Sequence, residues 1–131
     1  MTLKHGDCLE LMKNIPDGCI DMILCDPPYG TMIGAGLDGW KNATTTWDVR
    51  LDTEILFCEY ERILRRNGVA VLFSQEPYTA ELRSHNATNI NFAYPLIWKK
   101  EHFANALIAK KHLFRTLKIF LFSTKFMTDS Y

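Results

Sequence analysis

Apolar and polar positions follow one another in blocks along this chain, and the blocks predict a succession of helices and strands. Residues 7–15 carry apolar side chains at helical spacing, which predicts a short helix that a Pro16-Asp17-Gly18 turn ends. Residues 19–25 form a short, mostly apolar run that is typical of a buried strand in a parallel sheet. Similar runs predict further strands at residues 69–74, 92–99 and 117–124.

Two more helices are predicted between these strands. Asp52 or Thr53 can cap a helix that runs to about Arg66, and Asn67-Gly68 provides a left-handed stop for it. Residues 76–85 predict the other helix. Because strands that alternate with helices form helix-flanked sheets, the sequence predicts an α/β fold with a mainly parallel sheet.

The length of 131 residues fits one domain. No apolar run approaches the length of a membrane-spanning helix, and the polar N-terminus lacks the apolar region of a secretory signal, so a cytoplasmic protein without a membrane partner is expected. The cysteine spacings match no zinc pattern and the histidines are scattered, so we predict buried or half-buried free thiols and no metal site. The cysteines are Cys8, Cys19, Cys25 and Cys58.

The net charge of zero conceals an uneven distribution of charge. Residues 1–61 carry 11 acidic and 4 basic side chains, and residues 62–131 carry 4 acidic and 11 basic ones. A basic C-terminal half can face a polyanion such as nucleic acid. The alternative is a solvated surface that pairs with the acidic half, and composition does not decide between them.

The segment with the clearest chemical content is Asp26-Pro27-Pro28-Tyr29, directly after the predicted strand at 19–25. Ligands of open α/β sheets bind beyond the carboxyl ends of strands, so a carboxylate here lies where a site is expected. Two consecutive prolines fix φ and remove two N–H donors, which leaves a stiff segment rich in acceptors. The alternative is a plain tight turn after a buried strand.

This arrangement suits methylation of an exocyclic amine. The amine of adenine or cytosine is a poor nucleophile, because its lone pair is delocalised into the ring. The Asp26 carboxylate and the Pro27 carbonyl can accept its two protons, localise the lone pair and stabilise the developing positive charge. Tyr29 can stack on the base, which would first have to leave the DNA stack.

In these segments the chain resembles the DNA N6-adenine/N4-cytosine methyltransferases in which the catalytic motif precedes the cofactor motif. The similarity extends over nearly the whole chain. It rests on residues 6–10 (GDCLE), 20–30 (IDMILCDPPYG), 62–74 (RILRRNGVAVLFS) and 96–100 (LIWKK). The resemblance implies a Rossmann-like methyltransferase fold, S-adenosylmethionine as cofactor, and DNA methylation of the kind found in restriction-modification.

The same resemblance implies roles for individual residues. Asp26 and Pro27 would hold the target amine, Pro28 would shape the loop and Tyr29 would stack on the base. Asp7 would approach the adenine edge of the cofactor, although a helix N-cap is an equally good interpretation. An aspartate at the first position of the motif favours adenine N6 over cytosine N4. The residues expected to contact DNA are Trp40, Lys99, Lys100, Lys110, Lys111 and Arg115.

The chain also departs from the family pattern. The FxGxG cofactor segment of this family would follow the region present here, and residues 1–131 contain no such segment. The glycines at 34, 36 and 39 do not follow a strand and lie in a predicted long loop at 31–47, of a length that is usually functional or mobile. After it, Trp47-Asp48 either packs this loop near the base pocket or forms a core tryptophan with Asp48 capping nearby backbone.

We therefore expect residues 1–131 to be a single, incomplete methyltransferase domain, and two hypotheses remain. One is an enzyme that is complete only with a further C-terminal part or a partner chain. The other is a non-catalytic remnant that keeps the catalytic loop. An open sheet edge would in either case favour self-association, for example as a homodimer.

Overall fold

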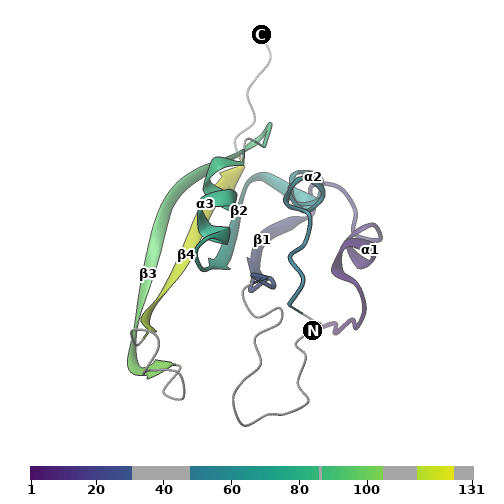
Figure 1. Cartoon of the computed structure of the whole chain (residues 1–131). Helices are drawn as coiled ribbons and strands as arrows, with labels where there is room; N and C mark the ends of the chain where they lie inside the picture. The colour runs from purple at the N-terminus through teal and green to yellow at the C-terminus, as the bar shows by residue number, and fades with distance from the viewer. Residues whose placement is uncertain (31–47, 86, 105–114, 126–131) are drawn as a thin grey trace.

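The computed structural model describes residues 1–30, 48–85, 87–104 and 115–125. Their elements are α1 (Cys8–Met12), β1 (Ile20–Cys25), α2 (Thr53–Ile63), β2 (Leu64–Ser74), α3 (Tyr78–Ser84), β3 (Ile90–Ala104) and β4 (Arg115–Lys125). The strands form one sheet in the order β1-β2-β4-β3. In Figure 1, α1 and α2 lie near β1 at one edge of the sheet, and β3 forms the opposite edge.

The α/β prediction is confirmed, but the sheet is less parallel than expected. Only β1 and β2 pair in parallel, whereas β4 is antiparallel to both β2 and β3. The chain connectivity explains the difference. A parallel pair needs a crossover such as α2, whereas β3 and β4 are separated only by residues 105–114, which suits an antiparallel pair.

The end of α2 also differs from the prediction. The helix stops at Ile63, since Leu64 is already extended and pairs with Ile20 of β1. Asn67 does adopt a left-handed φ of 61°, but it lies inside β2, where the register with β1 shifts, and does not cap the helix. Leu64 is fully buried, so its packing ends the helix three residues earlier than the polar stop signal indicated.

The core lies where the helices meet one face of β2. Ala70 and Leu72 of β2 are buried together with side chains from all three helices, and the hydroxyl of Thr79 donates to that of Ser74 at 3.0 Å, which joins α3 to the same face. The buried helical members of this cluster are Met12, Leu56, Phe57, Tyr60, Ile63, Tyr78 and Leu82.

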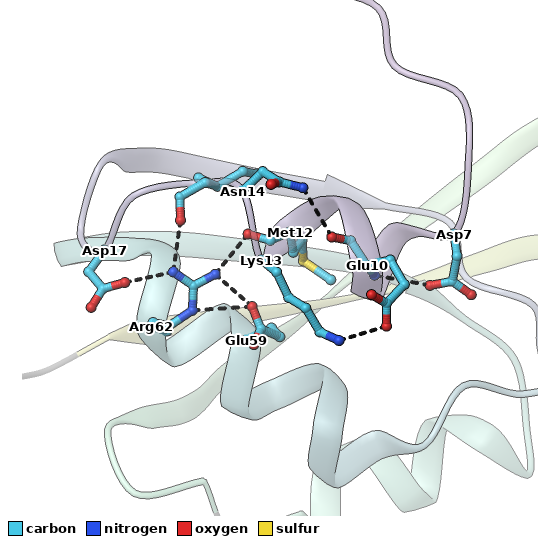
Figure 2. Close-up of polar contacts among 9 residues, drawn as sticks. Asp7, Glu10, Met12, Lys13, Asn14, Asp17, Glu59 and Arg62 are labelled. Atoms are coloured by element: carbon cyan, nitrogen blue, oxygen red, sulfur yellow. Dashed lines mark hydrogen bonds and ion pairs between the residues drawn. The ribbon is translucent and has the colours of Figure 1, made fainter.

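Arg62 fastens α1 and the turn before β1 to α2 (Figure 2). Its guanidinium donates to the carbonyl oxygens of Met12 and Ile15, both at 2.7 Å. It also forms ion pairs with Asp17 at 2.6 Å and Glu59 at 2.7 Å. A planar group with five N–H donors can satisfy several acceptors at once, so one side chain fixes the start of β1.

Several apolar side chains on the sheet remain exposed in the described structure. Met22 and Leu24 of β1 are 55% and 62% exposed, and Trp98 of β3 is 51% exposed. Within the described ranges, none of the helices has the length and apolar character needed to cross a bilayer. The cysteines are free thiols as predicted, but only Cys25 is half-buried, and the other three are exposed.

Candidate active site

The Asp26-Pro27-Pro28-Tyr29 segment leaves the carboxyl end of β1, as the sequence predicted. Asp26 is exposed, Pro27 is buried, and Tyr29 is half-buried against the core cluster. The segment is therefore anchored by its proline and tyrosine, while the carboxylate remains accessible. This is the arrangement that a ligand site beyond the end of a strand requires.

Tyr29 and Asp26 interact directly, because the Tyr29 hydroxyl donates a hydrogen bond to Oδ1 of Asp26. Burial, followed by this hydrogen bond, raises the pKa of Tyr29 well above its ordinary value. The phenol is therefore neutral and remains a donor at neutral pH. Its ring lies 6.4 Å from that of Tyr78, at a tilt of 36°, within the range of favourable aromatic pairs.

The residue after the segment is held by a carboxylate distant in sequence. Gly30 has a left-handed φ of 68°, and its N–H donates to Oδ1 of Asp48 at 3.1 Å. The Asp48 residue is only 3% exposed. Of the two interpretations of Trp47-Asp48, the structure confirms that Asp48 caps backbone, while Trp47 lies outside the described residues.

A second group of polar contacts surrounds Gly30, and sequence reasoning missed it. Arg50 packs so closely that a Cβ on Gly30 would lie 2.7 Å from its Cγ. The Arg50 guanidinium pairs with Glu81 of α3 at 2.5 Å, and Glu81 also accepts from Thr53 of α2 at 2.6 Å. Arg50 and Thr53 precede Glu81 by 31 and 28 positions in the sequence, so no local sequence signal marks these contacts. The four residues 26–29 do not line the adjacent surface pocket of about 660 Å³, which residues 50–54, Glu81, Ser84 and His85 form.

Asp7 is the N-cap of α1, the alternative that the sequence left open. Its Oδ1 accepts from the backbone N–H of Leu9 at 2.8 Å and from that of Glu10 at 3.2 Å, the second of which Figure 2 shows. The neighbouring residue, Cys8, is close enough to contribute to the raised pKa of Cys25, whose main cause is burial. The start of α1 therefore lies near the end of β1. The role of Asp7 toward a cofactor stays a prediction.

The predicted DNA-contacting residues are only partly described. Lys99 is exposed on β3. Lys100 and Arg115 belong to β3 and β4, but their side chains are not described, and Trp40, Lys110 and Lys111 lie outside the described residues. The pairing of Ile119 with both Ser74, the last residue of β2, and Ile97 shows that β3 extends past the end of β2. Because β3 runs in the same direction as β1, Lys99 lies toward the same end of the sheet as Asp26, although the two strands are on opposite sides of the sheet.

The described residues contain no group of three or more histidine, cysteine, aspartate or glutamate side chains that could hold a metal ion. The carboxylates near the candidate site have other partners. Asp26 binds Tyr29, Asp48 binds Gly30, and Glu81 binds Arg50 and Thr53. The chemistry that this arrangement supports is the acceptance of protons from a polar ligand by Asp26, with an aromatic ring beside it.

Comparison with known proteins identifies similar chains among DNA methyltransferases. Over 79 residues the chain is 34% identical to the type II methyltransferase M.HinfI of Haemophilus influenzae, a match that covers 51% of this chain and 22% of that protein. Over 70 residues it is 39% identical to the DNA adenine methyltransferase YhdJ of Escherichia coli, with the same shares. No family model matches the chain.

Solved structures show the same fold. The complex of M1.HpyAVI with SAM superposes with a TM-score of 0.64 at 17% identity, covering 96% of this chain and 54% of that one. A DNA modification methylase of Thermus thermophilus, TTHA0409, gives a TM-score of 0.61 at 17% identity, with the same coverage. The predicted resemblance to DNA methyltransferases is confirmed, and the chain spans about half the length of these structures and a smaller part of the curated relatives.

Proposed function

We propose that this chain forms the base-holding part of an S-adenosylmethionine-dependent DNA methyltransferase that acts on the N6 of adenine. The observation that carries the proposal is the exposed Asp26 carboxylate at the end of β1, with Tyr29 beside it. The similarity to M.HinfI and YhdJ supports it, and the second of these is named an adenine methyltransferase. Because DNA is the proposed substrate, we also propose a cytoplasmic location.

The target amine would bind between two acceptors. The Asp26 carboxylate and the Pro27 carbonyl accept its two protons, so the nitrogen lone pair is localised and points away from them. The cofactor, when bound, supplies the methyl group. Once the amine is methylated, the exposed Asp26 would accept the proton that the amine releases and pass it to water.

Tyr29 and the base would share the Asp26 carboxylate. The Tyr29 hydroxyl donates to Oδ1 of Asp26 in the structure, so an amine that binds this oxygen competes with it, whereas Oδ2 offers further acceptor sites. The ring is then available to stack on the flipped base, a contact worth about 1–3 kcal/mol in nucleic-acid complexes. The hydroxyl is therefore dispensable for stacking, whereas the ring is not.

The described residues fit only part of a cofactor site. Asp7 lies near the end of β1 and is exposed, so its carboxylate can meet one edge of the cofactor. We propose that a partner chain supplies the remaining contacts by packing beside β1. Among the described strands β1 pairs with β2 alone, and its exposed Met22 and Leu24 leave part of a parallel pair uncovered, although such strands are normally covered on both faces. A homodimer is the alternative, and light scattering of the purified chain distinguishes a dimer from a monomer that awaits another partner.

We propose that DNA lies across the end of the sheet at which β1 and β3 finish. Lys99 and Lys100 lie near that end of β3 and Arg115 begins β4, and basic side chains there can neutralise phosphates. The outer strands would thus hold the backbone of the DNA, while the base enters at β1.

The test is methyl transfer to DNA, with the product base identified by mass spectrometry. The wild-type chain is assayed alone and with co-expressed candidate partners, beside Asp26→Ala, Tyr29→Phe and the exposed control Glu54→Gln. We expect N6-methyladenine, a loss of about a hundredfold or more in Asp26→Ala, and activity near that of the wild type in Tyr29→Phe and Glu54→Gln. Formation of N4-methylcytosine would show that the substrate base is cytosine and not adenine.

Calorimetric titration with S-adenosylmethionine separates the two hypotheses about the chain. Binding that Asp7→Ala weakens would support a cofactor site in this chain. Absence of both binding and methylation, alone and with each partner, would contradict completion by a partner chain and leave the non-catalytic remnant or an enzyme completed by a further C-terminal part.

A further inference from the structure

We propose that Asp48 is a positioning residue for the base-holding loop, residues 26–30. In this proposal the carboxylate acts through the Gly30 amide and touches neither base nor cofactor. The consequence for catalysis rests on the proposed function, but the anchoring of the loop does not.

The loop has few ways to be anchored through its backbone. Pro27 and Pro28 have no N–H, so within residues 27–30 the backbone donors are the N–H groups of Tyr29 and Gly30. Gly30 gives its N–H to Asp48. A hydrogen bond to a side-chain oxygen matters most where water is excluded. Asp48 is almost fully buried, so this contact is well suited to fix the end of the loop.

Arg50 supports Gly30 from another direction. Its side chain occupies the space where a Cβ of residue 30 would lie, and its guanidinium is fixed by Glu81 of α3. Glu81 is held in turn by Thr53, the first residue of α2. Asp48 and Arg50 thus connect the loop to two helices of the packed core.

The Gly30 amide is bonded to Tyr29, so its hydrogen bond to Asp48 adds to the packing of the Tyr29 ring in fixing that residue. If the Gly30 amide is released, the Tyr29 ring and the Asp26 carboxylate that it contacts lose their fixed relation. Small errors in the position of reacting groups lower the rate of the chemical step more than they weaken binding. Loss of the Asp48 acceptor is therefore expected to lower kcat more than it raises KM for DNA.

The first measurement is amide hydrogen exchange by NMR in the wild type, Asp48→Ala, Asp48→Asn and the control Glu54→Gln. Asparagine keeps a side-chain oxygen that can accept from Gly30, whereas alanine removes it. We expect exchange at Gly30 to become about five- to tenfold faster in Asp48→Ala, with β2 amides unchanged, and to stay near the wild-type rate in Asp48→Asn and Glu54→Gln.

Unchanged exchange at Gly30 in Asp48→Ala would overturn the proposal, and so would equal acceleration throughout β2, which indicates general destabilisation. If Asp48→Ala does not fold, Asp48→Asn decides, since fast exchange at Gly30 in a folded asparagine variant contradicts an acceptor role for residue 48.

The second measurement is methyl-transfer kinetics with the same variants. We expect kcat to fall about tenfold or more in Asp48→Ala at nearly unchanged KM for DNA, and asparagine to restore most of it. An equal loss in Asp48→Asn would mean that the charge acts, and would contradict positioning. If the wild type methylates nothing while Gly30 exchange responds as expected, the proposed function fails and the anchoring role of Asp48 stands.

Discussion

The strands β2 and β3 are both rich in apolar residues, yet residues 68–74 of β2 are buried or half-buried, whereas residues 91–99 of β3 are exposed. Leu72 of β2 is 1% exposed, since α2 and α3 cover its face of the sheet. Leu96 of β3 is 43% exposed, and neighbouring Ile97 and Trp98 are more exposed still. The start of β3 reaches the core, since Ile90 is 3% exposed and Arg83 of α3 lies 5.3 Å from the centroid of Phe92, so the contrast concerns residues 96–98.

The difference shows which part of the sheet fixes the candidate site. Asp26 follows β1 and Asp48 precedes α2, so both lie beside the part of the sheet that the helices and the core cover, whereas Arg62 holds the start of β1 at the other end of that strand. The β3–β4 pair carries basic residues but little of the core. A preorganised site needs rigid support, whereas a surface that binds phosphates needs mainly charge.

The largest expected effect tests the comparison directly with two matched substitutions. Leu72→Ala removes a fully buried side chain and should lower the free energy of unfolding by about 2–5 kcal/mol. Leu96→Ala removes a side chain that is 43% exposed and should lower it by only about 1 kcal/mol. Urea unfolding followed by circular dichroism measures both. Equal losses would show that β3 is covered in solution, for example in a dimer.

Alkaline pH should lower the free energy of unfolding, because two buried tyrosines of the core cluster resist ionisation. Burial is the main cause that raises the pKa of Tyr60 and Tyr78, so both stay protonated in the folded state when the unfolded chain begins to ionise near pH 10. Their contribution to stability is complete below about pH 10 and is lost as the pH rises further, by about 1.4 kcal/mol per pH unit for each tyrosine.

Urea midpoints between about pH 9 and pH 11 measure this loss. In Tyr60→Phe the dependence on pH should be shallower than in the wild type. An unchanged dependence would mean that Tyr60 ionises as readily in the folded protein as in the unfolded chain.

The smallest expected effect distinguishes two glycines with similar backbones. Gly18 and Gly30 have φ values of 60° and 68°, but only Gly30 has a side chain, that of Arg50, within the space of a Cβ. Alanine at either position should cost about 1 kcal/mol for the left-handed backbone. Gly30→Ala should cost about 1 kcal/mol more, since its Cβ would lie 2.7 Å from the Cγ of Arg50, whose guanidinium is held by Glu81.

A double-mutant cycle with Arg50→Ala isolates this excess, which the double variant should remove. If Gly18→Ala and Gly30→Ala are equally destabilising, the packing of Arg50 on Gly30 contributes nothing to stability.

The sequence predicted the position of the candidate site better than it predicted the helix ends and strand directions around the site. An apolar run followed by Asp26-Pro27 was sufficient to place a carboxylate at the end of a strand, because strand and proline signals are local. The end of α2 was placed too late, because the polar Asn67-Gly68 signal was overridden by the burial of Leu64. The parallel character of the sheet was overestimated, because apolar runs do not reveal strand direction.

The sequence alone determined the order of helices and strands, the Asp26-to-Tyr29 motif and the family that the chain resembles, since all of these depend on residues adjacent in the chain. Only the tertiary structure decided that Asp48 holds Gly30, that Arg50 and Glu81 lie beside it, and that β3 remains exposed. These features join positions far apart in sequence. Such contacts depend on how the elements pack, and no local pattern of residues records them.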